Sequence, residues 1–419
     1  MDHFTASLAD ADPELAAALE GELDRQRRQL ELIASENYVS KATLEALGSP
    51  IVNKTVEGYP GRRYYGGAEF ADLVETLAVD RAKRLFGAAH ANVQPHSGSQ
   101  ANLACFLAFL EPGDRVLAMD LAAGGHLSHG APVNVSGRVM EVHHYGVDPT
   151  TGRLDLDAVA EIAREVRPRL IVCGASAYPR EIDFSGFRKI ADEVGAVLLA
   201  DIAHIAGLVA AGLHPDPIPA AHVVTTTTYK NLRGTRGGIV LTGDAELADR
   251  IDRAVFPGVQ GSVILNAVAA KAVCLGEALR PEFTGWAQRV LANARALAEV
   301  LVDRGLGVVT EGTDTPLVLV DLSPLGLTGR DAQEALERVG IAVNKNPVPG
   351  DPRPPWIASG IRLGTSAGTT RGLGEAEFRR VGELVAEVLA AAAAGREVPR
   401  RVPAAVAELC DAFPIYPDQ

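Results

Sequence analysis

The feature that most constrains the fold is an alternation of helical segments with short apolar runs between residues 70 and about 280. Helical spacing at 71–86 and 100–110 is followed by runs that are too short for helices and rich in β-branched residues. These runs occupy residues 115–119, 170–173, 196–200, 222–226 and 238–242. Apolar runs without polar alternation are typical of strands buried on both faces. The pattern predicts an α/β fold whose parallel or mixed sheet is covered by helices.

The length of the chain predicts more than one domain. With 419 residues, it exceeds the size that one hydrophobic core usually serves. Beyond residue 281 we expect helices at 285–304, 330–339 and 375–394, and strands at 308–310 and 315–320. We therefore predict an N-terminal helical arm (1–55) with an amphipathic helix at 13–33, a large domain (56–281) and a smaller α+β domain (282–419). The smaller domain ends in a tail that contains four prolines.

Composition excludes several classes of partner. The formal net charge is −13, which disfavours binding to nucleic acid or to an anionic membrane. No apolar run is long enough for a membrane span, and the first residues lack the apolar core of a signal peptide. The four cysteines form no CxxC pair, so we interpret them as buried thiols and expect neither disulfides nor a metal site. We expect a cytoplasmic protein.

A lysine follows one of the predicted buried strands. The segment Thr225-Thr226-Thr227-Thr228-Tyr229-Lys230 leads into the glycine-rich segment 234–238. A buried lysine is costly unless its charge is paired or removed, and a Schiff base with an aldehyde cofactor removes it. Taken alone, a lysine at a strand end is more often exposed to solvent.

Two further segments point to the same kind of site. Asp201 ends the run 196–200, where it could keep a pyridinium nitrogen protonated, although it could equally cap the following helix. Ser97-Gly98-Ser99 precedes an apolar helical stretch, where free N–H groups suit a phosphate, although Ser97 could be an ordinary N-cap. Each signal is weak, but together they supply a phosphate site, a ring partner and a covalent lysine in one sheet.

The sequence resembles the serine hydroxymethyltransferase family over residues 32 to about 389. The resemblance rests on long blocks, among them Leu32-Ile33-Ala34-Ser35-Glu36-Asn37, the Gly- and Tyr-rich loop 57–67, the segment 92–102, Gly124-Gly125-His126-Leu127 and the Thr-rich lysine strand. Further blocks are 201–212, Asn344-Lys345-Asn346 and Ser359-Gly360-Ile361-Arg362-Leu363-Gly364-Thr365.

The resemblance implies a fold-type I pyridoxal-phosphate enzyme, similar in architecture to aspartate aminotransferase, that forms a homodimer with shared sites. Lys230 matches the lysine that anchors the cofactor, Asp201 the partner of the ring nitrogen, and His126 the imidazole stacked on the ring. The remaining cofactor-side matches are Ser97, Gly98 and Ser99 at the phosphate, Ser176 and His204 near the phenolic oxygen, Thr227 beside the lysine, and Gly261 from the neighbouring subunit.

On the substrate side, the resemblance implies that Arg362 binds the substrate carboxylate, a bidentate task suited to arginine. Ser35 and Tyr65 match further substrate contacts, and Glu57 matches the acid–base carboxylate near the β-hydroxyl and the folate. The folate-side matches are Glu57, Tyr64, Leu121, Leu127 and Asn346. The implied reaction is reversible Cα–Cβ cleavage of serine to glycine, with one-carbon transfer to tetrahydrofolate as co-substrate.

The chain departs from the family pattern close to these residues. Tyr229 replaces a histidine before the lysine, and Thr55 replaces a tyrosine in the loop before Glu57. Thr235 replaces a proline, and the segment Ser262-Val263-Ile264-Leu265-Asn266 differs from the usual Gly-Pro-Leu-Met-His. A phenol gained at Tyr229 could compensate for the phenol missing at Thr55.

Alternatives therefore remain beside the ordinary reaction. One is a specialised relative, either a folate-independent threonine aldolase or transaldolase or an α-methylserine hydroxymethyltransferase, with an aldehyde in place of folate. The retained folate-side residues favour the ordinary activity. Another class is a non-catalytic protein that has kept the fold, against which the intact Lys230, Asp201 and Arg362 argue.

Overall fold

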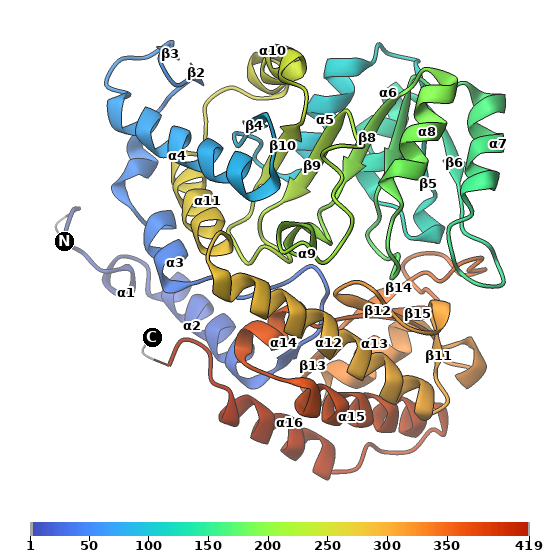
Figure 1. The fold of residues 1–419 in the computed structure, drawn as a ribbon. Coiled ribbons are helices and arrows are strands. Elements are labelled where there is room, and N and C mark those ends of the chain that lie inside the picture. The colour runs from blue at the N-terminus through green and yellow to red at the C-terminus, as the bar shows by residue number, and fades with distance from the viewer. Residues whose placement is uncertain (1–2, 418–419) are drawn as a thin grey trace.

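The computed structural model describes residues 3–417. A seven-stranded sheet lies at the centre of the larger part of the molecule (Figure 1). Its order is β4 (His90–Asn92), β10 (Gly238–Thr242), β9 (Val223–Thr227), β8 (Val197–Asp201), β7 (Leu170–Cys173), β5 (Arg115–Met119) and β6 (Glu141–Tyr145). β10 pairs antiparallel with both of its neighbours, β4 and β9, and the other strand pairs of this sheet are parallel. The predicted α/β class and mixed sheet are confirmed.

Helices cover both faces of this sheet because successive strand residues point to opposite sides. In β5, Leu117 and Met119 join one apolar cluster, whereas Val116 and Ala118 join another. The helices of this part are α4 (Glu69–Phe86), α5 (Gly98–Phe109), α6 (Val135–Val139), α7 (Leu156–Val166), α8 (Phe184–Val194), α9 (Ala206–Ala210), α10 (Ala248–Arg253) and α11 (Leu265–Ala278). Burial on both sides explains why the strands read as continuous apolar runs.

A second sheet is antiparallel and four-stranded, and it lies below the first in Figure 1. Its order is β11 (Gly307–Val308), β12 (Leu317–Asp321), β15 (Gly360–Gly364) and β14 (Asn344–Asn346). The accompanying helices are α12 (Pro281–Asp303), α13 (Gly329–Glu337), α14 (Ser366–Arg371), α15 (Glu375–Ala393) and α16 (Arg401–Ala412).

The helix α12 belongs to two cores. Phe283 and Trp286 pack into the core of the large sheet, whereas Leu297 and Leu301 pack into that of the small sheet. We keep the division at 55/56 and 281/282 as a proposal, with α12 as the element shared by the large and small domains.

The N-terminal arm departs from the expected single helix at 13–33. After α1 (Leu8–Ala11), α2 (Pro13–Arg28) ends five residues early, and β1 (Leu30–Glu31) pairs in parallel with β13 (Ile341–Ala342). Leu30 and Leu32 are thereby buried in the small core, which a solvent-facing helix could not achieve. A short helix, α3 (Lys41–Leu47), and the hairpin β2 (Gly58–Tyr59) and β3 (Arg62–Arg63) follow.

One expectation for the C-terminal part was wrong, and one helix there was not predicted. The strand expected at 308–310 ends at Val308, because Thr310 adopts a left-handed φ of 63° and its backbone carbonyl accepts a hydrogen bond from Arg180. The proline-containing tail forms α16, which packs against α2 (Figure 1). Pro403 lies in the first turn of α16, where its missing N–H is tolerated.

Candidate active site

A small cavity lies where the strands of the large sheet end. It is lined by Ser97, Gly98, Ser99, Asn102, His126, His129, Ala175, Ser176, Asp201, Ala203, His204, Thr227, Tyr229 and Lys230. These residues come from five separate segments, and in open α/β sheets ligands bind at this edge. All the residues that the sequence assigned to the cofactor, except Gly261, therefore lie around one cavity.

Lys230 follows β9 and is only 6% exposed. Burial lowers the pKa of its amine to about 8, while the charge of Asp201 acts in the opposite direction. The backbone carbonyl of Lys230 accepts a hydrogen bond of 2.9 Å from Nδ2 of Asn37, which fixes the chain at the lysine. A buried amine with a lowered pKa is a more available nucleophile at neutral pH, as a covalent anchor requires.

Asp201 is held as a buried carboxylate by two side chains. Its Oδ2 accepts hydrogen bonds of 2.8 Å from Nδ2 of Asn102 and from Nε2 of His129. Burial alone would raise the pKa of Asp201, but the hydrogen bond and charge of His129 hold it well below its usual value. Oδ1 also accepts from the backbone N–H of Ala203. Asp201 does not cap the following helix α9, as the alternative interpretation of the sequence had it, because the N-cap of α9 is Ile205. It closes a turn at Ala203 instead and still presents a negative charge to the cavity.

Sequence reasoning missed two of these residues, Asn102 and His129. Thr225 donates to Oδ1 of Asn102, which orients the amide so that its nitrogen faces Asp201. The only sequence signal for His129 was its place three residues after His126. Its partner Asp201 is 72 positions away along the chain, so the pairing could not be read locally.

Two other imidazoles in the cavity are held neutral. Burial lowers the pKa of His126 to about 4, against the opposing charge of Asp201. Nδ1 of His126 lies 2.7 Å from Oγ of Ser128. Burial, together with the charges of Lys230 and Arg362, lowers the pKa of His204 well below its usual value. Neutral rings at these positions can pack on an aromatic ligand without repelling a protonated ring nitrogen.

Ser97, Gly98 and Ser99 lie at the N-terminus of α5. Ser97 is the N-cap, as one reading of the sequence suggested, and its Oγ accepts from the N–H of Gln100 at 3.2 Å. Packing here requires glycine, because a Cβ on Gly98 would lie 2.6 Å from Cγ2 of Thr227. The helix dipole and unpaired N–H groups at such a terminus suit a phosphate dianion. We call Ser97, Gly98 and Ser99 the phosphate cradle. This cradle, Asp201 and Lys230 together fit a phosphorylated pyridine aldehyde.

Arg362 reaches the same region from the small sheet. It lies in β15 and is 8% exposed. Its Nη1 donates to the carbonyl of Ser176 at 2.6 Å, and its Nε donates to Oδ1 of Asn344 at 3.1 Å. Burial lowers the pKa of its guanidinium to about 10. Within residues 3–417 no carboxylate forms an ion pair with it, so an anionic ligand is the natural partner of this charge.

The remaining predicted residues do not line this cavity. They are Ser35, Glu57, Tyr64, Tyr65, Leu121, Leu127, Gly261 and Asn346. Glu57 and Gly261 lie near each other, since a Cβ on Gly261 would be 3.4 Å from Oε1 of Glu57. Tyr64 and Tyr65 are 74% and 48% exposed, and Tyr64 packs edge-on against Phe256.

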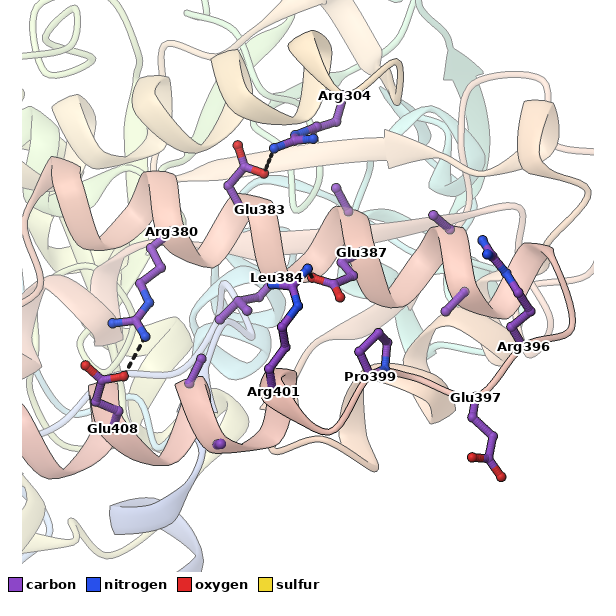
Figure 2. Close-up of a pocket in the computed structure, with 15 residues that line it drawn as sticks. Arg304, Arg380, Glu383, Leu384, Glu387, Arg396, Glu397, Pro399, Arg401 and Glu408 are labelled. Atoms are coloured by element: carbon purple, nitrogen blue, oxygen red, sulfur yellow. Dashed lines mark hydrogen bonds and ion pairs between the residues drawn. The ribbon is translucent and has the colours of Figure 1, made fainter.

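A larger cavity, of about 950 Å³, lies elsewhere, along α15 and α16. Six of the eight charged side chains that line it form ion pairs, among them Arg380–Glu408 and Arg401–Glu387 (Figure 2). It contains none of the predicted site residues. The described residues hold no group of three His, Cys, Asp or Glu side chains suited to a metal ion. None of the helices between residues 3 and 417 is both long and apolar enough to cross a membrane.

Comparison with known proteins gives a consistent result. The family model for serine hydroxymethyltransferase matches residues 8–385. A serine hydroxymethyltransferase of Nostoc punctiforme is 57% identical over 410 residues, which cover 98% of this chain and 96% of the relative. One from Rhodospirillum centenum is 57% identical over 418 residues, covering 99% of this chain and 97% of the relative.

Proposed function

Because the chain belongs to the serine hydroxymethyltransferase family, we propose that it interconverts serine and glycine with one-carbon transfer to tetrahydrofolate. The observation that carries this proposal is the convergence of Lys230, Asp201 and the Ser97–Ser99 cradle on one cavity. These three features provide the covalent, electronic and phosphate contacts that pyridoxal phosphate needs.

In this proposal, the cofactor is held by residues of the large sheet. Lys230 would anchor it covalently, Asp201 would hold the ring nitrogen protonated, and the N–H groups of Gly98 and Ser99 would bind the phosphate. His126 would pack on the ring, and Ser176, His204 and Thr227, which line the same cavity, would contact its polar substituents. When bound, pyridoxal phosphate acts as an electron sink that stabilises negative charge developing at Cα.

The substrate side uses a different set of residues. Arg362 binds the amino-acid carboxylate with the donors that Ser176 and Asn344 leave free, and thereby orients the Cα–Cβ bond. Glu57 exchanges a proton with the β-hydroxyl oxygen, with Ser35 and Tyr65 as further contacts. Tyr64, Leu121, Leu127 and Asn346 provide the folate-side surface.

We further propose a homodimer in which Gly261 serves the cavity of the partner subunit. Two features support this: Gly261 lies beside Glu57 and not at the Lys230 cavity of its own chain, and one face of α4 exposes apolar side chains. Phe70, Leu73 and Leu77 of that face are 72%, 65% and 45% exposed. An exposed apolar stripe of this kind is typical of an interface.

We also propose that the enzyme is cytoplasmic. The four cysteines are all free and buried, as is usual for proteins of a reducing compartment.

A second candidate activity is folate-independent cleavage of a β-substituted amino acid such as threonine. The observation that favours it is Tyr229, which lines the cavity beside Lys230. Its ring packs under the guanidinium of Arg236, 4.5 Å from the ring centre. A bulky phenol held in this position changes the space and the hydrogen bonding available to the aldehyde.

The test of the proposed function combines chemistry with mapping. The purified protein, loaded with pyridoxal phosphate, is expected to form glycine from serine only when tetrahydrofolate is present. Borohydride reduction should label Lys230, and Lys230→Ala should abolish the label. Lys271 is also a buried lysine and serves as the internal control in the peptide map. Labelling at Lys271, or serine turnover that does not depend on folate, would contradict the proposal.

A further inference from the structure

A second buried lysine, Lys271, lies in the middle of α11. Its side chain is only 1% exposed. Its Nζ donates to three backbone carbonyls, those of Val93 at 2.7 Å, Pro95 at 2.9 Å and Gly238 at 3.0 Å. An ammonium group has three donors, so all of them are used. None of the acceptors is a carboxylate, and the positive charge is therefore not neutralised by direct contact.

The three carbonyls belong to the segments that build the phosphate cradle. Val93 and Pro95 lie between β4 and the N-cap Ser97, so Lys271 binds the chain directly before the cradle. Gly238 begins β10, and its N–H donates to the carbonyl of Pro95 at 3.0 Å. Lys271 thus joins the strand that leads into the cradle to the strand beside it.

The atoms around Lys271 are closely packed. A Cβ on Gly237 would lie 2.1 Å from Cε of Lys271, and a Cβ on Gly238 would lie 2.3 Å from the carbonyl oxygen of Ser97. The backbone of the cradle, β10 and the lysine stem are therefore in direct contact. A shift of the ammonium group would be transmitted to Ser97 through the backbone.

Burying a charge without a counter-ion is costly. Burial lowers the pKa of Lys271 to about 7, and the charge of Glu75 acts in the opposite direction. Glu75 is itself buried, and its carboxylate is hydrogen-bonded by Gln94 and Arg63 instead of by Lys271. A neutral side-chain amide could also hydrogen-bond to both strands, and its burial would require less free energy than burial of an ammonium group. The positive charge is accounted for if an anion binds close to the cradle.

We propose that Lys271 is a positioning residue for the phosphate of the cofactor. It holds the segment 93–97 so that the N–H groups of Gly98 and Ser99 converge, and its buried charge favours a dianion at that point. The proposal rests on the proposed function, because it needs a phosphorylated ligand. It assigns Lys271 no contact with the substrate or the reacting atoms.

The test compares pyridoxal phosphate with pyridoxal, which lacks the phosphate. Each is titrated into the cofactor-free protein, and binding is followed by absorbance. Lys271→Met replaces the ammonium by an apolar side chain of similar shape. We expect the preference for pyridoxal phosphate over pyridoxal to fall by about tenfold or more, the scale of one interaction with a charged group. Affinity for pyridoxal should change by less than about threefold.

A matched control is Asn293→Leu. Asn293 is buried to the same extent, and its amide donates to the carbonyl of Leu373, under the small sheet and away from the cradle. This variant should lose stability but keep the wild-type preference. If Lys271→Met does not fold, Lys271→Gln replaces it in the test, because glutamine still donates two hydrogen bonds. In this variant the preference for pyridoxal phosphate over pyridoxal should fall by about threefold or more.

The outcomes separate the two proposals. A wild-type protein without preference for pyridoxal phosphate over pyridoxal would contradict the proposed cofactor. A wild-type preference that persists in Lys271→Met or Lys271→Gln would overturn the role of Lys271 and leave it a structural tie. Inorganic phosphate gives an independent readout. It should raise the unfolding midpoint of the cofactor-free wild type and of Asn293→Leu, but not that of the Lys271 variants.

Discussion

Replacing Arg362 by alanine tests the substrate side of the site. A guanidinium has five N–H donors, of which the carbonyl of Ser176 and the amide oxygen of Asn344 each accept one. Three donors remain, and a bidentate contact with a carboxylate needs two. Arg362 has no acidic partner within residues 3–417, so the substrate carboxylate is the charge expected to complete the pair.

The size of the effect follows from these contacts. Loss of a charge-assisted interaction costs about 1.5–3 kcal/mol, which corresponds to a rise of roughly 10- to 150-fold in the dissociation constant. Arg362→Ala should therefore bind glycine much more weakly while it retains pyridoxal phosphate. The dissociation constant of Arg362→Lys for glycine should lie between those of the wild type and Arg362→Ala, because lysine keeps the positive charge but lacks the planar pair of donors.

The assay is an equilibrium titration of the cofactor-loaded protein with glycine, followed by the change in cofactor absorbance. Asn344→Ala is the control for orientation, since it removes one acceptor of Arg362 but leaves the guanidinium. Its dissociation constant for glycine should rise only a few-fold. A glycine titration of Arg362→Ala that matches wild type would refute the assigned role, as would equal losses in Arg362→Ala and Asn344→Ala.

Other variants test the pH dependence and the departures from the family. Burial and the charge of Glu36 raise the pKa of Glu31 to about 8, so folding binds a proton and wild-type stability should fall as the pH rises from 4.5 to 8. The free energy of unfolding of Glu31→Gln, measured with a denaturant, should equal that of the wild type at pH 5. At pH 9 it should be higher by at least about 1.4 kcal/mol, which is the free energy of a shift of one pKa unit. The same difference in free energy at both pH values would argue against a raised pKa of Glu31. We expect the wild type to cleave threonine without folate, as measured by acetaldehyde release, and undetectable release would disfavour a specialised site. The double variant Thr55→Tyr/Tyr229→His should shift the ratio of serine to threonine cleavage towards serine, and its shift should differ from the sum of the shifts of the two single variants. A double variant with the wild-type ratio would show that neither departure affects substrate preference.

The sequence was most informative where burial alone decides structure. The strands at 115–119, 170–173 and 238–242 were predicted with the observed bounds, because strands covered on both faces are apolar throughout. The positions of Lys230 and Asp201 could be predicted from these strands, since both residues lie at the ends of buried strands. Local pattern was sufficient for these elements.

Pairing between distant segments could not be predicted in this way. The strand Leu30–Glu31 has two residues and exists because Ile341–Ala342 lies beside it, and two residues carry no periodicity. Lys271 looks like an ordinary surface lysine within a helix. Its burial depends on carbonyls 176 and 178 positions earlier in the chain.

The charges around the cavity explain how a chain with a net charge of −13 can bind two anions. Lys230, Lys271 and Arg362 are all buried, and burial is the main cause of the lowered pKa in each case. The buried carboxylate of the cavity, Asp201, is already bound by His129 and Asn102. The surface is acidic, but the site has an excess of cations. That excess matches a phosphate dianion and an amino-acid carboxylate. Binding of these anions should raise the pKa values of Lys271 and Arg362 towards their usual range, because each of these cations then gains a counter-charge.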